Sequence, residues 1–380
     1  MQLSVIILNY NVRYFLELCV SSVEKALENT DGEIIVVDNN SQDDSCAMMK
    51  RRFPNVKLIE NKENSGFPKG NNIGVEVAQG EYICILNPDT VVAEDTFAKV
   101  LAFAKKQEKL GIVGVKLIDG TGNFLPESKR GTPTPFVAFT KITGLYKIFP
   151  KTFGKYYAQH LSENETGKVD ILVGAFMVMK RDLYNEIGGF DENCFMYSDD
   201  IDLSYMTLKK GKSNYYFHET SVIHYKGEST IKDGTYMKRF REAMNFFYKK
   251  HFRVSFLFSV FMEMGIVFFS FVKMFQGKPK PKLSPENYIL ISDNEILREN
   301  LEKQLNKTVE ILGVTQEFSK NTTAEIVFDQ NYLDFKIVIK TLETNKSKSF
   351  TFKILPKSAG FMIGSNSSFD RGEIINISDF

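Results

Sequence analysis

The chain has 380 residues, more than a typical domain of about 100–200 residues, so one large and one smaller domain are expected. Its 48 Lys and Arg nearly balance its 47 Asp and Glu, which excludes an overall field that attracts nucleic acid. The four cysteines form no C-x-x-C pair. This argues against a disulfide framework or a zinc site and favours a reducing compartment.

The first part of the chain alternates short apolar runs with helical patterns. Strands are expected over 3–8, 33–37, 56–60 and 81–86, and helices over 13–28, 44–52, 71–78 and 94–106. This rhythm predicts a mainly parallel sheet with helices on both faces. Ligands in such sheets bind at the carboxyl ends of the strands.

The N-terminal stretch "MQLSVIILNYN" is also taken as a strand. Its apolar run is too short for a signal peptide and has no basic leader. We therefore expect the active domain to stay on the cytoplasmic side.

The rest of the chain divides by composition. A Pro- and Gly-bearing basic-aromatic loop is expected over 120–168, and a long helix from about Thr235. The predicted organisation is a catalytic α/β domain (1–235), a helical segment (236–276), a Pro/Lys linker (277–286) and a small α/β domain of unknown role (287–380).

Two strand-end carboxylates and one histidine are candidates for binding. Asp38 in "VVDNNSQDDS" is either a turn residue that caps the next helix or an acceptor for a base or ribose. Asp89 in "LNPDT" is either part of a turn or a ligand for a divalent cation that bridges a diphosphate. His224, after an apolar run, is either structural or a metal or phosphate contact.

The run "FMYSDDIDLSYM" places three carboxylates, Asp199, Asp200 and Asp202, within four positions. In a helix, Asp199 and Asp202 would repel each other at i,i+3. One interpretation is a helix start with Ser198 as N-cap, where the macrodipole favours acids. The other is a catalytic carboxylate beside a reacting hydroxyl. Both can hold at once.

Several enzyme classes lose their main support. No G-x-G-x-x-G follows the first strand, and no P-loop, H-E-x-x-H or G-x-S-x-G motif occurs. The stretch "ENSGFPKGNNIG" supplies glycines for close backbone approach and amides for sugar or phosphate oxygens, although a plain loop and helix cap also explain it.

Six segments in order resemble family 2 glycosyltransferases of the GT-A fold, especially the rhamnosyltransferase-like branch. They are "VIILNYN", "VVDNNSQDDS", "ENSGFPKGNNIG", "YICILNPDT", "GAFMVMKRDLYNEIGGFDENCFMYSDDIDL" and "VIHYKGEST". The resemblance covers about 3–230 and implies an inverting transfer of a sugar from a nucleotide-diphospho-sugar. The acceptor would be a hydroxyl of a saccharide or lipid-linked saccharide in cell-surface polysaccharide synthesis.

The resemblance also implies residue roles. Asp200 would be the general base, preceded by Asp199 where glutamate is usual, while Asp89 and His224 would hold Mg²⁺ or Mn²⁺. The residues expected to contact the donor are Asn9, Asp38, Asn40, Asn64, Gly66, Lys69, Asn71, Asn87 and Gly174. One further departure is Met206, which stands where the branch often has arginine.

Two alternatives remain at this stage. A nucleotidyltransferase would need a Gly-rich, Arg- or Lys-bearing loop after the first strand, and "NYNVRYFLE" does not supply it. The other is a decayed transferase that binds sugar nucleotides or serves assembly without catalysis.

The segment Val254–Val272 predicts attachment to a membrane. Its length is close to the roughly 20 residues needed to span hydrocarbon, but basic residues flank both ends and give no inside–outside bias. A helix lying in the interface on anionic lipid is therefore favoured over a spanning one, at the cytoplasmic face. The alternative is a helix that packs on the catalytic domain with its polar stripe in water.

Overall fold

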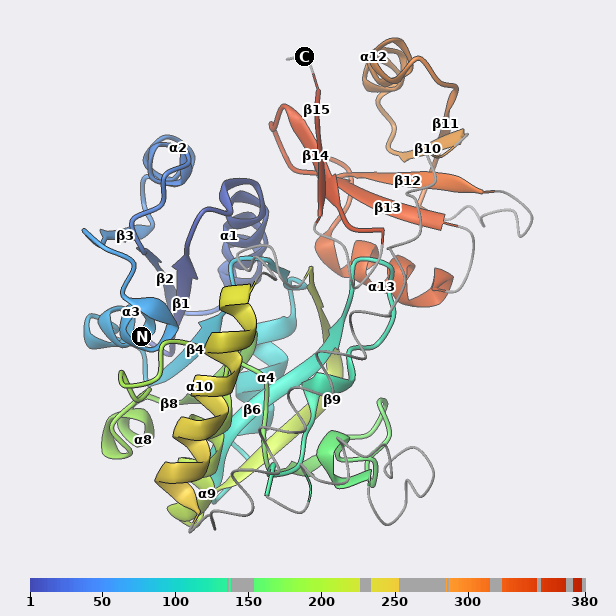
Figure 1. Ribbon diagram of the computed structural model, residues 1–380. Helices are drawn as coiled ribbons and strands as arrows, with labels where there is room; N and C mark the ends of the chain where they lie inside the picture. Colours follow the sequence, from blue (N-terminus) through green and yellow to red (C-terminus); the bar gives the residue numbers. More distant parts are fainter. Residues whose placement is uncertain are drawn as a thin grey trace.

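The structure is a computed structural model that describes residues 1–134, 137, 154–225, 234–252, 285, 287–314, 323–346, 350–366 and 372–377. Two β-sheets with flanking helices make up these residues (Figure 1). The larger belongs to the first part of the chain, and the smaller to the C-terminal region, defined here as residues 287–377.

The first elements of the larger sheet follow the predicted βαβα rhythm. They are β1 (Leu3–Asn9), α1 (Arg13–Leu27), β2 (Gly32–Asp38), α2 (Ser45–Arg52), β3 (Lys57–Glu60), α3 (Gly66–Glu76) and β4 (Tyr82–Leu86). β1 pairs in parallel with β2 on one side and β4 on the other. Helix α3 begins earlier than expected, because Pro68 lies in its first turn, where a missing N–H costs little.

The second half of this sheet departs from the predicted mainly parallel order. Its elements are β5 (Thr90–Val91), α4 (Thr96–Ala104), β6 (Leu110–Ile118), η1 (Pro126–Ser128), η2 (Gly154–Tyr157), β7 (Gly167–Val169), β8 (Phe176–Lys180), α8 (Arg181–Glu186), α9 (Asp199–Lys209), β9 (Ser213–His224) and α10 (Gly234–His251). The order is β3-β2-β1-β4-β8-β6-β9-β5, with β7 beside β9.

The sheet is therefore mixed, since β8 runs antiparallel to both β4 and β6. A long connection that includes η1, η2 and β7 leads into β8, and such a connection can return the chain in either direction. Its apolar sequence fits either direction.

Strand β9 pairs with different strands at its two ends. Its pairing with β6 shifts register between Val115 and Lys116, so its first part pairs with β7 and its end with β5. Thr90 lies opposite His224, and the Tyr225 amide donates to the Asp89 carbonyl at 2.9 Å. The turn that carries Asp89 is thereby fixed beside the end of β9.

A single buried asparagine, Asn214 on β9, fastens α9 to the sheet. Its Oδ1 accepts from the Ile112 amide at 3.0 Å and the Thr207 hydroxyl at 2.7 Å. Its Nδ2 donates to the carbonyls of Asp170 and Ser204. All its hydrogen-bonding groups are used, which buried amides require, and α9 is held in one position.

The C-terminal region forms the second sheet. Its elements are β10 (Asn287–Ile291), α12 (Glu295–Leu305), β11 (Val309–Leu312), β12 (Ala324–Asp329), α13 (Phe335–Asn345), β13 (Phe350–Leu355), β14 (Phe361–Gly364) and β15 (Glu373–Asn376). The order is β11-β10-β12-β13-β14-β15. The first four strands are parallel, and β14 and β15 join in antiparallel pairs.

The two sheets share one hydrophobic cluster. Phe15 on α1 and Val91 on β5 belong to the same cluster as Val338 on α13 and Phe361 on β14. Figure 1 shows α13 beside the larger sheet, below the strands of its own sheet. The C-terminal region thus packs directly on the elements that follow β1 and β4.

Polar contacts reinforce this packing. The Glu94 carboxylate accepts from the amides of Phe335 and Lys336, at 2.7 and 2.9 Å, and so caps α13 from the other sheet. Arg52 donates to the carbonyls of Lys357 and Ser358.

No helix in the described part of the chain is long and apolar enough to cross a membrane. The segment Val254–Val272, for which membrane attachment is predicted, lies outside the described residues, as does most of the predicted linker.

Candidate active site

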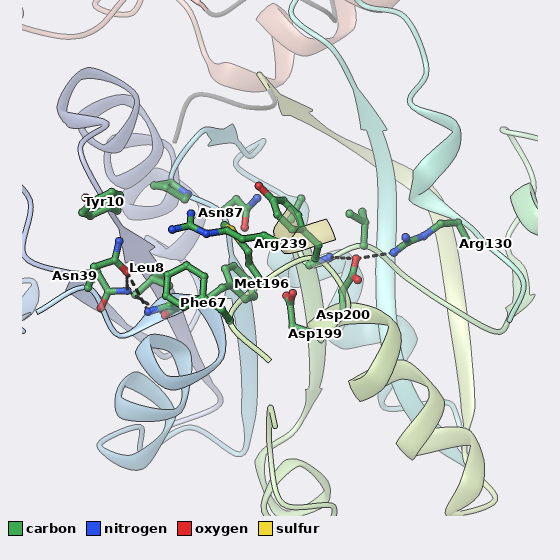
Figure 2. A pocket seen from close by; sticks show the side chains of 18 residues that line it. Leu8, Tyr10, Asn39, Phe67, Asn87, Arg130, Met196, Asp199, Asp200 and Arg239 are labelled. Carbon is green, nitrogen blue, oxygen red and sulfur yellow. Dashed lines mark hydrogen bonds and ion pairs between the residues drawn. The ribbon is translucent and has the colours of Figure 1, made fainter. Parts of the chain in front are cut away.

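A pocket of ≈ 310 Å³ opens at the carboxyl ends of β1, β2 and β4 and faces the start of α9 (Figure 2). It is lined by Leu8, Tyr10, Asn39, Asn64, Gly66, Phe67, Asn87, Pro88, Arg130, Val173, Gly174, Ala175, Phe195, Met196, Tyr197, Asp199, Asp200 and Arg239. Six predicted site residues meet there: Asn64, Gly66, Asn87, Gly174, Asp199 and Asp200.

The acidic run starts a helix, as one of its two interpretations predicts. Helix α9 begins at Asp199 with Ser198 as N-cap. The Ser198 hydroxyl, however, lies 3.2 Å from the Cys194 sulfur and makes no capping bond. The carboxylates thus lie where unpaired N–H groups and the macrodipole favour negative charge.

Asp200 forms an ion pair with an arginine. Its Oδ2 accepts from Arg130 Nη2 at 2.6 Å and from the Gly174 amide at 3.2 Å. The same Nη2 donates to the Leu172 carbonyl at 3.0 Å. Both charged side chains are largely buried, so the guanidinium orients Asp200 in the pocket wall.

Local sequence patterns do not indicate that Arg130 takes this role. It lies in the segment expected to be a loop, 70 positions before Asp200. Its backbone pairs with Ile171 through two hydrogen bonds of 2.9 Å. A lone arginine in a loop carries no local signal, and only this long-range pairing fixes its position.

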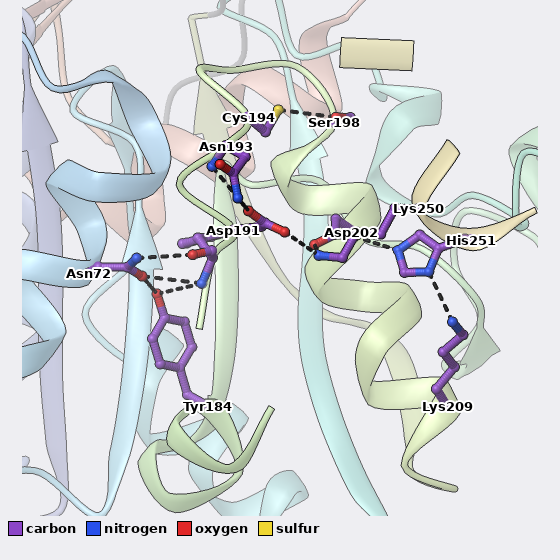
Figure 3. Close-up of polar contacts among 11 residues, drawn as sticks. Asn72, Tyr184, Asp191, Asn193, Cys194, Ser198, Asp202, Lys209, Lys250 and His251 are labelled. Carbon is purple, nitrogen blue, oxygen red and sulfur yellow. Dashed lines mark hydrogen bonds and ion pairs between the residues drawn. The ribbon is translucent and has the colours of Figure 1, made fainter. Parts of the chain in front are cut away.

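Asp202 does not line the pocket, and its side chain contacts residues at the end of α10 (Figure 3). Lys250 Nζ lies 2.8 Å from its Oδ2, and His251 Nε2 contacts its Oδ1. Lys250 also reaches Asp191 at 2.6 Å. Asp202 therefore anchors the end of α10, and it does not approach a substrate in the pocket.

Asp199 has no ion-pair partner among the described residues. Burial and, less strongly, the neighbouring Asp200 charge together raise the pKa of its carboxyl to about 7, against backbone hydrogen bonds from Asp199 and Tyr197 and the charge of Arg130. Asp199 therefore changes charge near neutral pH.

On the other side of the pocket, Asp38 closes a turn. Its Oδ1 accepts from Asn9 Nδ2 at 2.7 Å and the Ser41 hydroxyl at 2.6 Å, and its Oδ2 from the Ser41 amide at 2.8 Å. Asp38 and Asn9 are both buried behind the pocket wall. Their contact with a nucleotide stays a prediction.

Asn39 lines the pocket where the sequence analysis selected Asn40. The Asn39 Nδ2 donates to the Gly66 carbonyl at 3.0 Å, and its Oδ1 accepts from Asn61 and Ser65. It therefore holds the loop before α3 against the end of β2. Asn40 is exposed, has a φ of 62° and is not among the lining residues.

Two further predicted donor contacts are not brought to this pocket. Asn71 is fully buried in α3, where its Nδ2 donates to the Phe67 carbonyl. Lys69 is exposed and lines a separate surface hollow with Asn185 and Gly189. Met206 also lies elsewhere, beside Lys250. The Gly- and Asn-rich pattern predicts the turn before α3, but it does not predict which side chains of α3 line the pocket.

Asp89 and His224 lie together, as predicted, near Asn87. Asp89 Oδ1 is 3.4 Å from His224 Nε2, and Asn87 Nδ2 is also 3.4 Å from that nitrogen. Three buried atoms here have no hydrogen-bond partner within the described residues: Asp89 Oδ1, His224 Nδ1 and Asn87 Oδ1. No group of three or more His, Cys, Asp or Glu able to hold a metal occurs in the described part of the chain.

One carboxylate and one imidazole suit Mn²⁺, or Mg²⁺ held chiefly by its oxygen ligand, provided that substrate oxygens and water complete the coordination. The unpartnered Asp89 oxygen is consistent with such a shared site. The residues therefore fit a cation that arrives together with a diphosphate.

The family model for "Glycosyl transferase family 2" matches residues 4–188. The chain contains a family 2 glycosyltransferase domain. The protein is accordingly a sugar-transferring enzyme, and the family match runs from β1 past β8 and ends before α9. The acidic run of this transferase lies outside the matched residues.

Two curated relatives are similar to this glycosyltransferase. The N-acetylglucosaminyl-diphospho-decaprenol L-rhamnosyltransferase of Mycobacterium tuberculosis is 25% identical over 245 residues, 61% of this chain and 78% of the relative. The poly(ribitol-phosphate) beta-glucosyltransferase of Bacillus spizizenii is 29% identical over 171 residues, 43% of this chain but only 26% of that longer protein.

Among solved structures, a mannosyltransferase of Pyrobaculum calidifontis in complex with GDP-Man and Mn²⁺ is 19% identical, with a TM-score of 0.46. The match covers 67% of this chain and 65% of that one.

The environment of Asp199 predicts a pH-dependent stability. Because its folded pKa is raised above the ordinary carboxyl value, the neutral form is favoured, and its contribution to stability is lost as pH rises through about 7. We therefore expect the free energy of unfolding of the isosteric Asp199→Asn, relative to that of the wild type, to be higher at about pH 8 than at about pH 5. Urea unfolding at both pH values measures it.

The matched control is Asp182→Asn on the exposed face of α8, whose stability relative to the wild type is expected to be the same at both pH values. A constant difference for Asp199→Asn would contradict the buried, titrating environment of Asp199.

Proposed function

We propose that this glycosyltransferase moves a sugar from a nucleotide-diphospho-sugar to a hydroxyl of a saccharide or lipid-linked saccharide, with inversion at the anomeric carbon. The observation that carries the proposal is the pairing of Asp200 with Arg130 at 2.6 Å in the wall of the pocket. That pocket also receives the strand ends that carry Asn39 and Asn87. A fixed carboxylate thus faces the ends of the strands that meet ligands in α/β sheets.

In the proposed reaction, Asp200 is the general base. Its carboxylate takes the proton of the acceptor hydroxyl while that oxygen forms a bond to the anomeric carbon. The bond from this carbon to the donor diphosphate breaks, and its electron pair leaves with the diphosphate. Attack from the face opposite the leaving group inverts the configuration, and a positioned base speeds such a step by about 10²–10⁴-fold.

Arg130 and Gly174 serve this step by holding Asp200. Both contact Oδ2, which leaves the Oδ1 atom of the carboxylate for the incoming hydroxyl. Asp199, with its pKa raised to about 7, contributes a carboxyl that in its neutral form donates a hydrogen bond to a sugar hydroxyl.

Asp89 and His224 would hold Mg²⁺ or Mn²⁺ at the donor diphosphate. Such a cation neutralises charge on the leaving group when it is bound. The protein's own part is to keep the two side chains buried and adjacent. The turn between β4 and β5 does this by pairing with the end of β9.

The acceptor class is proposed from the relatives. One is named for an N-acetylglucosaminyl-diphospho-decaprenol acceptor and the other for poly(ribitol-phosphate). We infer an acceptor of the cell envelope, a saccharide linked to a lipid or a polymer, with synthesis at the cytoplasmic face of the membrane. The nucleotide, the sugar and the linkage are left open.

Attachment at that face is proposed for the apolar segment Val254–Val272, which follows α10 in the sequence. The basic residues on both of its sides favour contact with anionic lipid headgroups over a transmembrane orientation.

The first prediction concerns the base. Asp200→Asn keeps the shape and the Arg130 contact but cannot accept the proton, so transfer is expected to fall about 10²–10⁴-fold with nearly unchanged donor affinity. Single-turnover transfer and donor titration measure the two effects. Asp182→Asn is the control, and more than about a tenth of wild-type turnover in Asp200→Asn would exclude Asp200 as the base.

The second prediction concerns the cation. Asp89→Ala removes a hard oxygen donor, so we expect weaker Mn²⁺ binding and loss of the Mn²⁺-dependent gain in nucleoside diphosphate affinity. Calorimetric titration of the protein with MnCl₂ measures the first effect. Titration with the nucleoside diphosphate, once in MnCl₂ and once in EDTA, measures the second. Full transfer activity of the wild type in excess EDTA would rule out the metal role.

The third prediction concerns the membrane. We expect the full chain to bind vesicles of anionic phospholipid in a flotation assay, and a variant with Phe258, Phe261 and Phe268 changed to Ser to bind less. Phe328→Leu, in the cluster that the two sheets share, is the control for disturbed apolar packing elsewhere in the protein. Wild-type protein that stays entirely in the vesicle-free fraction at low salt would exclude attachment.

A further inference from the structure

The pocket holds two arginines with different environments. Arg130 is committed to Asp200 and the Leu172 carbonyl. Arg239, on α10, has no ion-pair partner among the described residues and is exposed. It contacts an aromatic ring: its guanidinium carbon lies 4.7 Å from the centre of the Phe195 ring.

Phe195 is a fixed platform for this guanidinium. Its carbonyl accepts from the Phe67 amide at 3.1 Å. Its ring lies so close to Gly66 that a Cβ there would approach Cδ2 to 2.8 Å. Phe195 nevertheless remains 40% exposed, and Arg239 lies over its ring on the pocket side. The start of α3 thus supports the ring from behind.

Helix α10 is fixed as well. Its last turn is tied to α9 by Lys250 and His251, which both contact Asp202. Phe247 adds an edge-to-face contact with Tyr205, with ring centres 5.8 Å apart. The helix that carries Arg239 is therefore docked on the helix that carries Asp199 and Asp200.

The direction of the side chain indicates which part of a substrate it meets. Figure 2 shows Arg239 running across the pocket away from Arg130, toward the side that carries Asn87 and Tyr10. Asn87 contacts His224, which lies beside Asp89. Arg239 thus extends toward the end of the pocket where the leaving group of the proposed reaction would be.

We propose that Arg239 binds the diphosphate of the nucleotide-sugar donor while its guanidinium is stacked on Phe195. Stacking uses the face of the guanidinium and leaves its N–H groups free in the plane. These groups match paired phosphate oxygens in a bidentate manner. A diphosphate carries negative charge, and Arg239 supplies a cation in the lining of the pocket additional to the metal.

This inference rests on the proposed donor class, and the experiment tests the donor class and the role of Arg239 separately. UDP, GDP and dTDP are titrated into the full-length wild type with MnCl₂ by calorimetry, and the nucleotide that binds is compared with its monophosphate. If none of the three binds the wild type, the proposed donor class fails, and with it the role of Arg239.

With a bound nucleotide identified, Arg239→Ala is expected to weaken diphosphate binding about 10–100-fold, since a hydrogen bond to a charged group contributes about 1.5–3 kcal/mol. Monophosphate binding should change less. Arg239→Lys should give an intermediate loss, because the charge remains but the planar fork is gone. Arg241→Ala, on the same helix, is the control and should bind like the wild type.

Two results would overturn the proposal. One is diphosphate affinity in Arg239→Ala within about twofold of the wild type. The other is an equal loss for monophosphate and diphosphate in both Arg239→Ala and Arg239→Lys, which would mark damage to the pocket and not a missing diphosphate contact. Thermal unfolding of each variant verifies that it is folded.

Discussion

Three carboxylates in the first turn of one helix must each be neutralised, and the structure does so in three different ways. Asp200 meets the guanidinium of Arg130, and Asp202 meets Lys250 and His251. Asp199 meets no cation among the described residues and takes up a proton near neutral pH. Buried charges are tolerated only with such compensation. Each solution brings a different part of the chain to α9.

The consequences extend through the catalytic part of the molecule. Arg130, the partner of Asp200, belongs to a segment whose backbone pairs with Ile171. The partners of Asp202 fix α10, which carries Arg239 across the pocket. One acidic turn therefore joins a base, its orienting arginine and a second arginine. Had Asp202 been apolar, α10 would have lost its main polar attachment to α9.

The sequence predicted well what depends on neighbouring residues. The strands from Leu3 to Leu86 and most of their helices follow from local apolar periodicity, and the start of α9 from its acidic turn. The strand ends at Asn87 and Asp89 were expected at the site because parallel strands bring their carboxyl ends to one edge.

What the sequence could not predict depends on contacts distant along the chain. The direction of β8, the pairing of Arg130 with Asp200 and the attachment of Asp202 to Lys250 link residues separated by 48 positions or more. The sequence also does not predict which face of α3 lines the pocket. Lys69 and Asn71, in a Gly- and Asn-rich stretch, are expected to contact the donor, yet neither lines the pocket. Asn39 was passed over for its exposed neighbour Asn40.

The shared cluster between the two sheets has a consequence for the order in which the chain can fold during synthesis. Phe15 on α1 leaves the ribosome more than 300 residues before Phe361 and Ile363, which belong to the same cluster. The first sheet is complete in sequence only at the end of β9, His224, so its apolar flank stays uncovered while the residues from there to Phe361 are made. Contacts between residues so far apart in the sequence slow folding and prolong the exposure of aggregation-prone apolar surface. For this protein, the interval before the last strands appear is the period in which chaperones have most to protect.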